Sequence, residues 1–445
     1  FPNKNYNEVI KRIEKGKFFY FEKKISEENY EKLMQLGDKS IEPRDNLIRI
    51  YPQKNLFSHI IGQIDNDNNG ISGLEKSLDE KLKNIREPVK LTVDKDIQFL
   101  IRDELEQFNK VFSTKGSAAI LMNVRNGEIL SLVSLPDFDP NKREKISDKN
   151  LINRATKGVY EFGSVFKTFT LAAAFHENVI EPKTEFVDLP KSLTCAGFPI
   201  REYDNKIPST LTAEQILVRS GNIGSVKIGQ EVGEKKLKIF LTKLGLLEKI
   251  DFDIEEVGKP IKFSWGKCPL ATASFGHGIT TTLLQLAKAY SIIANGGYEI
   301  KPSLIHNSET KKKEKILNKG VSINILPILR KVVTTKEGTA SLANIKGYEI
   351  GGKTGTAQKS LMGSYSENKK INTFVSVFPT SKPKFVLAIM LDEPKINKDY
   401  IYEYRDGSNF KLKGSPRNTA GWNSVEVSGH IIEKIGPILA TKYSE

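Results

Sequence analysis

The stretch Glu161-Phe162-Gly163-Ser164-Val165-Phe166-Lys167 places a serine three residues before a lysine, and an apolar run from 169 to 175 follows it. Residues three apart are neighbours on one face of a helix, so this S-x-x-K pair brings a hydroxyl and an amine together. Unpaired N–H groups and the dipole at a helix start favour negative charge on an oxygen and disfavour a protonated amine. The pattern predicts that Ser164 is a nucleophile and that Lys167 accepts its proton.

The S-x-x-K motif alone is weak evidence. Four other matches occur in aromatic, charged or proline-containing segments, and none opens an apolar helix. For an isolated match, a serine on a solvated surface is the more ordinary interpretation.

Two further motifs follow in a fixed order. They are the S-x-N sequence Ser220-Gly221-Asn222 and the K-T-G sequence Lys353-Thr354-Gly355, the latter being the one K-[ST]-G in the chain. Motifs so far apart in sequence can act together only if the fold brings them into one cleft, as a nucleophile, a proton relay and a substrate clamp require. We therefore predict that Ser220, Asn222 and Lys353 complete the catalytic set begun by Ser164 and Lys167.

The third motif also matches a phosphate-binding loop. Residues 347–354 satisfy G-x-x-x-x-G-K-[ST], in which backbone N–H groups surround phosphates. Such a loop needs a buried strand before it and a long helix after it. Here the polar segment 340–346 precedes the motif and no apolar helix follows, so the pattern favours the catalytic interpretation over nucleotide binding.

Composition sets broad limits. The chain has 445 residues, of which 38% are hydrophobic and 27% are charged, which is typical of a globular protein with a sizeable core. Its apolar runs are far shorter than the roughly 20 residues needed to span a bilayer. Because the chain begins at Phe1 without a methionine, the sequence leaves open whether a membrane anchor or signal precedes it.

Charge and cysteine content leave two alternatives open. The net charge is +14 and lies almost entirely after residue 88, which is compatible with an anionic partner or with simple compositional bias. No basic cluster interleaved with aromatic residues predicts nucleic-acid binding. Cys195 and Cys268 could be bridged or free. The five histidines have no metal-ligand spacing, so we predict neither a metal nor another cofactor.

The pattern of elements indicates two regions. Residues 1–88 contain charged helical stretches at 7–16, 26–36 and 73–84. Residues 89–445 combine strands with helices, the strands being predicted at 117–124, 128–134, 372–378 and 385–391, and the helices at 96–108, 282–294 and 425–440. Strands from both ends of this region flank a helical block that holds Ser164 and Ser220. We predict an α+β (α/β) module with an antiparallel sheet packed against helices.

With these motifs in place, the chain resembles the class B penicillin-binding proteins over nearly its whole length. Arg49-x-Tyr51-Pro52 and Gly70-x-Ser72-Gly73-Leu74-Glu75 look like motifs of the pedestal that precedes the enzyme domain in that family. Ser134-x-Pro136-x-Phe138-Asp139 and Phe275-Gly276-His277-Gly278 look like motifs of the enzyme domain itself. Phe162 replaces the usual proline before Gly163-Ser164, and Gly221 stands where serine is common.

The resemblance implies a peptidoglycan D,D-transpeptidase in which Ser164 forms an acyl-enzyme with a D-Ala-D-Ala stem peptide. It assigns base, relay and amide-binding roles to Lys167, Ser220 with Lys353, and Asn222. Thr354, Gly355 and Thr356 would bind the substrate, and the N–H groups of Ser164 and Thr356 would form the oxyanion hole. It also implies domains at 1–88 and 89–445, an all-helical subdomain, and acylation by β-lactams.

The likeness to the septal, division-type members implies an inner-membrane protein with its bulk in the periplasm and partners among cell-division proteins. Two other classes share the trio of motifs. A β-lactamase or D,D-carboxypeptidase transfers the acyl group to water, although a class A lactamase needs an activating glutamate that the sequence does not reveal. A β-lactam sensor or scaffold would keep the pocket without turnover.

Overall fold

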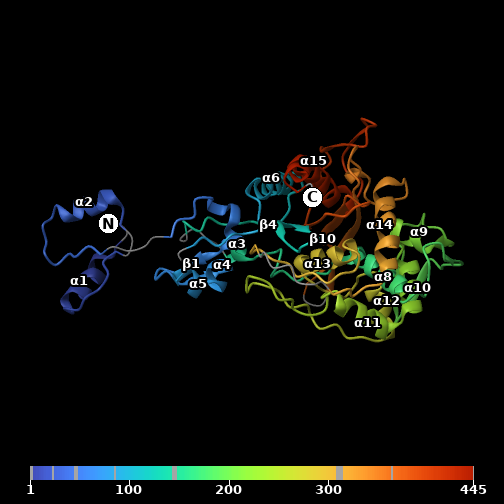
Figure 1. Ribbon diagram of the computed structural model, residues 1–445, viewed down its shortest axis with the longest axis horizontal. Helices are drawn as coiled ribbons and strands as arrows, with labels where there is room; N and C mark the ends of the chain where they lie inside the picture. Colours follow the sequence, from blue (N-terminus) through green and yellow to red (C-terminus); the bar gives the residue numbers. More distant parts are fainter. Residues whose placement is uncertain are drawn as a thin grey trace.

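The computed structural model describes residues 4–22, 25–44, 49–84, 87–142, 148–306, 314–361 and 364–443. Its N-terminal part lies to one side of a larger body that combines a sheet with helices (Figure 1). Among the described helices, none is long and apolar enough to cross a membrane.

A five-stranded antiparallel sheet forms the centre of the larger body. Its order is β4-β3-β11-β10-β9, so the first two strands of this region lie beside strands from near the end of the chain. The strands are β3 (Gly116–Asn123), β4 (Ile129–Leu135), β9 (Gly351–Leu361), β10 (Ser364–Phe378) and β11 (Phe385–Asp392). Every residue of β4 and β11 is buried, because helices cover both faces of the sheet.

Helices from distant parts of the chain cover the sheet (Figure 1). On one face lie α6 (Lys95–Val111) and α15 (Ser424–Lys442), and on the other lies α13 (Leu283–Ala294). The helix α14 (Lys319–Thr334) packs beside β9 and against α8 (Lys167–His176). The predicted sheet packed against helices is confirmed.

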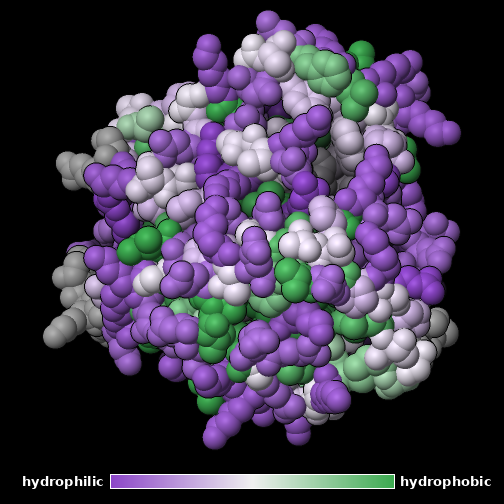
Figure 2. Space-filling model, turned by 90° about the vertical axis from the view of Figure 1, so that its right-hand side faces the viewer, coloured by the Kyte–Doolittle hydropathy of each residue, from purple (hydrophilic) through white to green (hydrophobic). Residues whose placement is uncertain are grey.

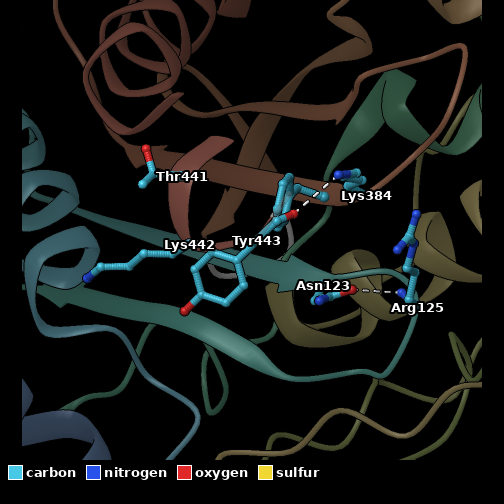
Figure 3. Close-up of a pocket in the computed structure, with 7 residues that line it drawn as sticks. Asn123, Arg125, Lys384, Thr441, Lys442 and Tyr443 are labelled. Carbon is cyan, nitrogen blue, oxygen red and sulfur yellow. Dashed lines mark hydrogen bonds between the residues drawn. The ribbon is translucent and has the colours of Figure 1, made fainter. Parts of the chain in front are cut away.

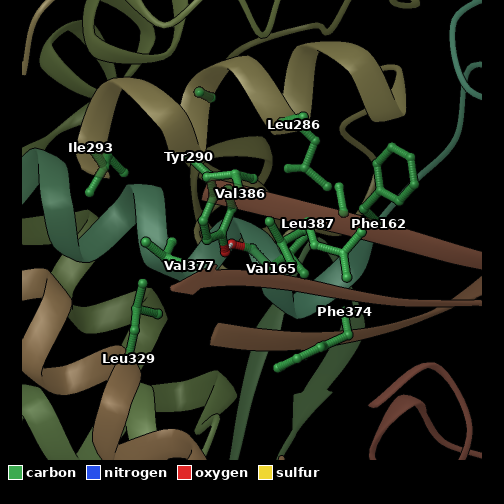
Figure 4. Packing of buried hydrophobic residues seen from close by; sticks show 14 of the residues in the cluster. Phe162, Val165, Leu286, Tyr290, Ile293, Leu329, Phe374, Val377, Val386 and Leu387 are labelled. Atoms are coloured by element: carbon green, nitrogen blue, oxygen red, sulfur yellow. Dashed lines mark hydrogen bonds between the residues drawn. The ribbon is translucent and has the colours of Figure 1, made fainter. Parts of the chain in front are cut away.

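The helix α13 packs its apolar side chains onto the sheet directly beside the S-x-x-K segment (Figure 4). Leu286 and Ile293 lie over β11, where Val386 and Leu387 are fully buried. Each such side chain contributes on the order of 1.5–3 kcal/mol when it leaves water. This part of the core therefore supports the segment that carries Ser164.

A helical block lies at the end of the molecule opposite to the N-terminal part (Figure 1). Its helices are α9 (Ala213–Val218), α10 (Asn222–Val232), α11 (Glu234–Lys243) and α12 (Lys267–Ala273). Short strands accompany them, namely β5 (Glu185–Phe186), β6 (Ser192–Cys195), β7 (Phe198–Arg201) and β8 (Leu211–Thr212). Figure 2 shows this end of the molecule, whose surface is mostly hydrophilic with small separate apolar groups.

The N-terminal part consists of short elements. They are α1 (Tyr6–Glu14), α2 (Glu27–Met34), a 3-10 turn (Lys54–Phe57), α3 (Ser58–Ile61), β1 (Gln63–Ile64), β2 (Gly70–Ser72), α4 (Gly73–Ser77) and α5 (Asp79–Asn84). Helix α2 begins as predicted, because the Ser26 side chain accepts a hydrogen bond from the Asn29 N–H. The single helix predicted over 73–84 is wrong in one respect, since it is interrupted at Leu78.

Residues 49–84 pack closely on the larger body. The backbone of Tyr51 exchanges two hydrogen bonds with the Asn141 side chain, at 3.0 and 2.9 Å. Ile60 and Leu74 belong to the same buried cluster as the sheet. In contrast, α1 and α2 contain no buried residue.

The remaining described elements are short connections. They are α7 (Asp148–Leu151), β12 (Ile401–Glu403), β13 (Lys411–Lys413) and the 3-10 turns η3 (Gly163–Phe166), η4 (Ser341–Ala343) and η5 (Ala420–Trp422). Cys195 and Cys268 form a disulfide, with their Cα atoms 5.6 Å apart. The bridge links β6 to α12 and settles the alternative that the sequence left open.

Candidate active site

The S-x-x-K motif lies where the 3-10 turn η3 runs into α8. Ser164 is half-buried in the turn, and Lys167 is the first residue of α8 with only 1% of its surface exposed. The buried Tyr290 fixes this junction from α13, since its hydroxyl donates to the Val165 carbonyl oxygen at 3.0 Å and lies 2.9 Å from Thr168 Oγ1. The predicted position of Ser164 at a helix start is present, with a 3-10 turn as the first turn.

The S-x-N motif connects α9 to α10. Ser220 is buried and adopts a left-handed backbone with φ of 59°. A non-glycine residue rarely adopts this conformation without tertiary support, and such residues concentrate at functional sites. Asn222 is the first residue of α10. The bend between the two helices thus presents both side chains to the lysine of the first motif.

The K-T-G motif lies on β9, the edge strand of the sheet. Sequence reasoning predicted no strand here, and the phosphate-loop alternative is wrong because Lys353 lies inside a strand rather than in a loop before a helix. Lys353 is completely buried. A Cβ atom at Gly355 would lie 2.0 Å from the Phe162 carbonyl oxygen, so only glycine allows β9 to approach the Ser164 turn so closely.

The three motifs converge on the hydroxyl of Ser220. Lys353 Nζ donates to Ser220 Oγ at 2.9 Å, and Lys167 Nζ lies 3.2 Å from the same oxygen. Lys167 Nζ also donates to the Ser220 carbonyl oxygen at 2.5 Å and to Asn222 Oδ1 at 2.7 Å. One hydroxyl therefore links two amines, an arrangement that can pass a proton between them.

The hydroxyl of Ser164 forms no hydrogen bond with another residue in the described part of the chain. The direct contact between Ser164 and Lys167 suggested by their spacing is therefore absent from the hydrogen bonds of this form. Catalytic hydrogen bonds are often long in unliganded enzymes and tighten with substrate.

Burial changes the charge of both lysines. It lowers the pKa of Lys167 to about 7, and the nearby Glu202 carboxylate opposes this shift. Burial and the positive charge of Lys167 lower the pKa of Lys353 well below its usual value. Because two adjacent buried amines resist carrying two charges, one of them is available as a proton acceptor near neutral pH.

Two threonines of β9 lie in and just after the K-T-G motif. Thr354 is buried and its Oγ1 lies 2.7 Å from Thr339 Oγ1. Thr356 is half-buried and its Oγ1 accepts a hydrogen bond from the Ala420 N–H at 3.0 Å. Two residues apart on a strand, they lie on the same face. Tyr290, Thr339 and Glu202 each form a hydrogen bond with a residue of one of the three motifs. They were missed because single polar residues outside a motif carry no sequence signal.

A pocket of about 400 Å³ lies elsewhere, beside the turn between β3 and β4 and the end of α15 (Figure 3). Its lysines already have partners, since Lys384 donates to the Tyr443 carbonyl oxygen and Lys442 binds Asp94 and Asp96. None of the three motifs lines it. The buried cluster around Ser220, where the three motifs meet, is therefore the better candidate for catalysis.

Comparison with known proteins agrees with this geometry. Residues 117–408 match the penicillin binding protein transpeptidase domain. The chain is 31% identical to the probable peptidoglycan D,D-transpeptidase FtsI of Caulobacter vibrioides and 31% identical to the stage V sporulation protein D of Bacillus subtilis. Each match covers 88% of this chain and 67% of the relative.

Solved structures give the same result. Penicillin binding protein 3 of Mycobacterium tuberculosis superposes with a TM-score of 0.76 at 25% identity, covering 87% of this chain and 91% of that one. Its complex with aztreonam superposes with a TM-score of 0.75 at 25% identity, covering 87% and 90% of the two chains. The chain therefore belongs to the penicillin-binding protein transpeptidases. It is a serine-type enzyme with the transpeptidase fold, and the resemblance drawn from its motifs is confirmed.

Proposed function

We propose that the protein cross-links peptidoglycan stem peptides through an acyl-enzyme on Ser164. Ser164 Oγ attacks the carbonyl carbon between the two terminal D-alanines, the peptide bond breaks, and the terminal D-alanine leaves as an amine. An amine from a neighbouring stem peptide then attacks the ester, which releases Ser164 and forms the cross-link. The observation that carries this proposal is the convergence of Lys167, Lys353 and Asn222 around Ser220, beside the Ser164 turn.

Lys167 acts as the base for Ser164 in this mechanism. Its burial and its lowered pKa supply a neutral amine near pH 7, and its position on the first turn of α8 places it one helical turn from the nucleophile. Ser220, with Lys353 behind it, passes the proton toward the leaving amine. The short distances from Ser220 Oγ to both amines support this relay.

The edge strand β9 binds the substrate. An edge strand offers unpaired backbone groups to an extended peptide, and Gly355 allows it to lie against the Ser164 turn. Thr354 and Thr356 bind the terminal carboxylate, and Asn222 binds a substrate amide. The N–H groups of Ser164 and Thr356 form the oxyanion hole, which is supported by the close approach of Gly163 to the Thr356 backbone.

The same chemistry makes the protein a target of β-lactams, whose strained amide is attacked as the D-Ala-D-Ala bond is. The relative from Mycobacterium tuberculosis has been solved in complex with aztreonam and with ampicillin. A stable penicilloyl adduct at Ser164 is therefore expected.

Residues 1–88 serve as a non-catalytic pedestal and residues 89–445 as the transpeptidase domain. All three motifs lie after residue 88. The likeness to the FtsI-named relative supports septal wall synthesis, with an inner-membrane anchor before Phe1, the enzyme on the periplasmic face and cell-division proteins as partners.

The test is acyl transfer from a thioester analogue of the stem peptide in the presence of a D-amino acid. We expect the D-amino acid to be incorporated into the product. Hydrolysis without incorporation would instead indicate a D,D-carboxypeptidase, and rapid turnover of penicillin would indicate a β-lactamase. Stable acylation by penicillin with no reaction of the thioester would indicate a sensor or scaffold.

A further inference from the structure

A carboxylate outside the three motifs holds the S-x-N turn in place. Glu202 directly follows β7, and its Oε2 accepts the Asn222 N–H at 2.6 Å while its Oε1 accepts the Ile223 N–H at 2.9 Å. These are the first N–H groups of α10, which have no partner within the helix. A negative charge at this end of a helix also interacts favourably with the helix dipole.

Gly221 makes this carboxylate necessary. It is the N-cap residue of α10 and has no side chain to accept a hydrogen bond. A Cβ atom at Gly221 would lie 3.5 Å from Glu202 Oε1, so the carboxylate occupies the space beside this glycine. Glu202 thus supplies from another segment the cap that the S-x-N turn lacks.

The same segment also orients the Asn222 side chain. Asn222 Nδ2 donates to the Arg201 carbonyl oxygen at 2.7 Å, which leaves Oδ1 directed at Lys167 Nζ, 2.7 Å away. Both the backbone and the amide of Asn222 are therefore held by two consecutive residues, Arg201 and Glu202. Any movement of this pair changes the contact between Asn222 and Lys167.

The disulfide fixes the hairpin that carries this pair. Strand β6 pairs with β7, and Cys195 at the end of β6 is bonded to Cys268 on α12. Helix α12 packs in turn against α10. The β6–β7 hairpin is thus joined to α10 in two ways: through Glu202, and through the disulfide to α12, which packs on α10.

We propose that Glu202 is a positioning residue for acylation, holding the S-x-N turn against Lys167 and placing a negative charge near that lysine. This inference rests on the proposed function, in which Lys167 is the base for Ser164. Through its charge, Glu202 favours the protonated form of Lys167 and opposes the effect of burial. It therefore raises the pH above which Lys167 is mostly neutral, against the larger effect of burial.

Other charged groups face this site from several elements. Lys353 faces Lys167 from β9, and Arg201 and Asp204 flank Glu202 along the chain. Arg219 and Arg417 interact electrostatically with Tyr203, and Arg417 pairs with Asp204 at 3.9 Å. Of these groups, Glu202 alone has a carboxylate that contacts the backbone of the S-x-N turn.

The test measures the rate constant of acylation by a fluorescent penicillin between pH 5 and pH 9 for four proteins. They are the wild type, Glu202→Gln, Glu202→Asp and the control Glu231→Gln, which removes an exposed carboxylate from the same helix α10. Glutamine keeps the size of the side chain but removes its charge and one acceptor, whereas aspartate keeps the charge and shortens the reach.

For Glu202→Gln we expect the plateau rate to fall about tenfold and the pH midpoint of the rate to move down by about half a unit or more. Glu202→Asp should lower the plateau but keep the wild-type midpoint, and Glu231→Gln should change neither. The pH midpoint of the acylation rate shows whether Glu202 acts on Lys167 through its charge or only caps helix α10. If Glu202→Gln keeps the wild-type midpoint, Glu202 only caps a helix and the proposal is overturned, whatever happens to the plateau.

The wild type separates this proposal from the function on which it rests. If the wild type is not acylated at any pH, the proposed function itself fails. If the wild type is acylated and both Glu202 variants match it in rate and midpoint, only the role of Glu202 is refuted.

Discussion

At the scale of single residues, the proposed mechanism makes the reactivity of Ser164 depend on the protonation of Lys167. A lysine that is only 1% exposed loses its proton far more readily than a lysine in water, because burial disfavours its charged form. The neutral amine is the form that can accept a proton from Ser164. Because the pKa of Lys167 is lowered to about 7, the neutral fraction rises through the physiological range.

The rate of acylation should therefore increase from pH 5 to pH 8 with a midpoint near 7, and then level off. Lys167→Arg keeps a positive charge that cannot be lost in this range, so it should slow acylation by on the order of 10²-fold or more. Time courses of penicillin labelling, quenched at intervals over this pH range, give the pH midpoint for the wild type and the loss of rate in Lys167→Arg. A variant with near wild-type rates and the same pH profile would show that another group is the base.

At the scale of elements, the site depends on how closely β9 approaches the Ser164 turn. Gly355 makes this approach possible, since any side chain there would collide with the Phe162 backbone. The turn itself is held from the other side by Tyr290 on α13. The Ser164 turn is thus held between β9 and α13.

The substitution Gly355→Ala should separate β9 from the Ser164 turn. A displacement of about 1 Å in an active site can cost on the order of 10²-fold in rate, and we expect a loss of at least about tenfold in acylation. A matched control is Gly320→Ala in α14, where a Cβ meets nothing within 4 Å and the residue is exposed. The control should keep wild-type acylation and gain up to about 1 kcal/mol in stability. Equal acylation by the two variants would contradict the role given to Gly355.

Some elements could be predicted from sequence because they carry local signals. Helix α13 has Thr282 as a capping residue and a glycine pair after its end, and it was found within one residue. The β3–β4 hairpin has an Asn-Gly turn between two apolar runs and was found in the same way. In each case the residues that define the element also mark its limits.

Strand β9 could not be found in this way. It contains Gly351, Gly352 and Gly355 and buries a lysine, and these residues disfavour a strand by their own propensities. They are tolerated because β10 pairs with the strand and because Gly355 lies against the Phe162 backbone, where no side chain fits. The K-T-G motif thus predicts a catalytic role for Lys353 but gives no signal of the strand in which it lies. Glu202 was missed for a different reason. It lies far from Asn222 in sequence and belongs to no motif, so nothing local marks it.

At the scale of the whole molecule, the N-terminal part divides into a peripheral and a packed segment. Helices α1 and α2 bury no residue, whereas Ile60 and Leu74 from residues 49–84 lie in the core of the larger body. Glu256 also accepts hydrogen bonds from the Gly73 N–H at 3.2 and 3.3 Å. The boundary at residue 88 stays a prediction, and contacts between the two sides cross it.

Two truncations test whether residues 49–84 stabilise the larger body. A chain that begins at residue 49 should keep the wild-type thermal midpoint and acylation rate. A chain that begins at Val89 loses Ile60 and Leu74 and should be less stable by several kcal/mol, since each such loss typically costs about 2–5 kcal/mol. If it folds it should still be acylated, because all three motifs remain. Equal thermal midpoints for the two chains would show that residues 49–84 do not support the larger body, and a folded but unreactive Val89 chain would show that they take part in catalysis.

The central claim is that Ser164 is the acylated nucleophile. The most direct measurement is to react the protein with a fluorescent penicillin and to locate the label by mass spectrometry of its peptides, with Ser164→Ala as the comparison. We predict a single penicilloyl adduct on the peptide that contains Ser164, and no adduct on a folded Ser164→Ala protein. A label on Ser220 or on any other residue, or undiminished labelling of Ser164→Ala, would contradict it.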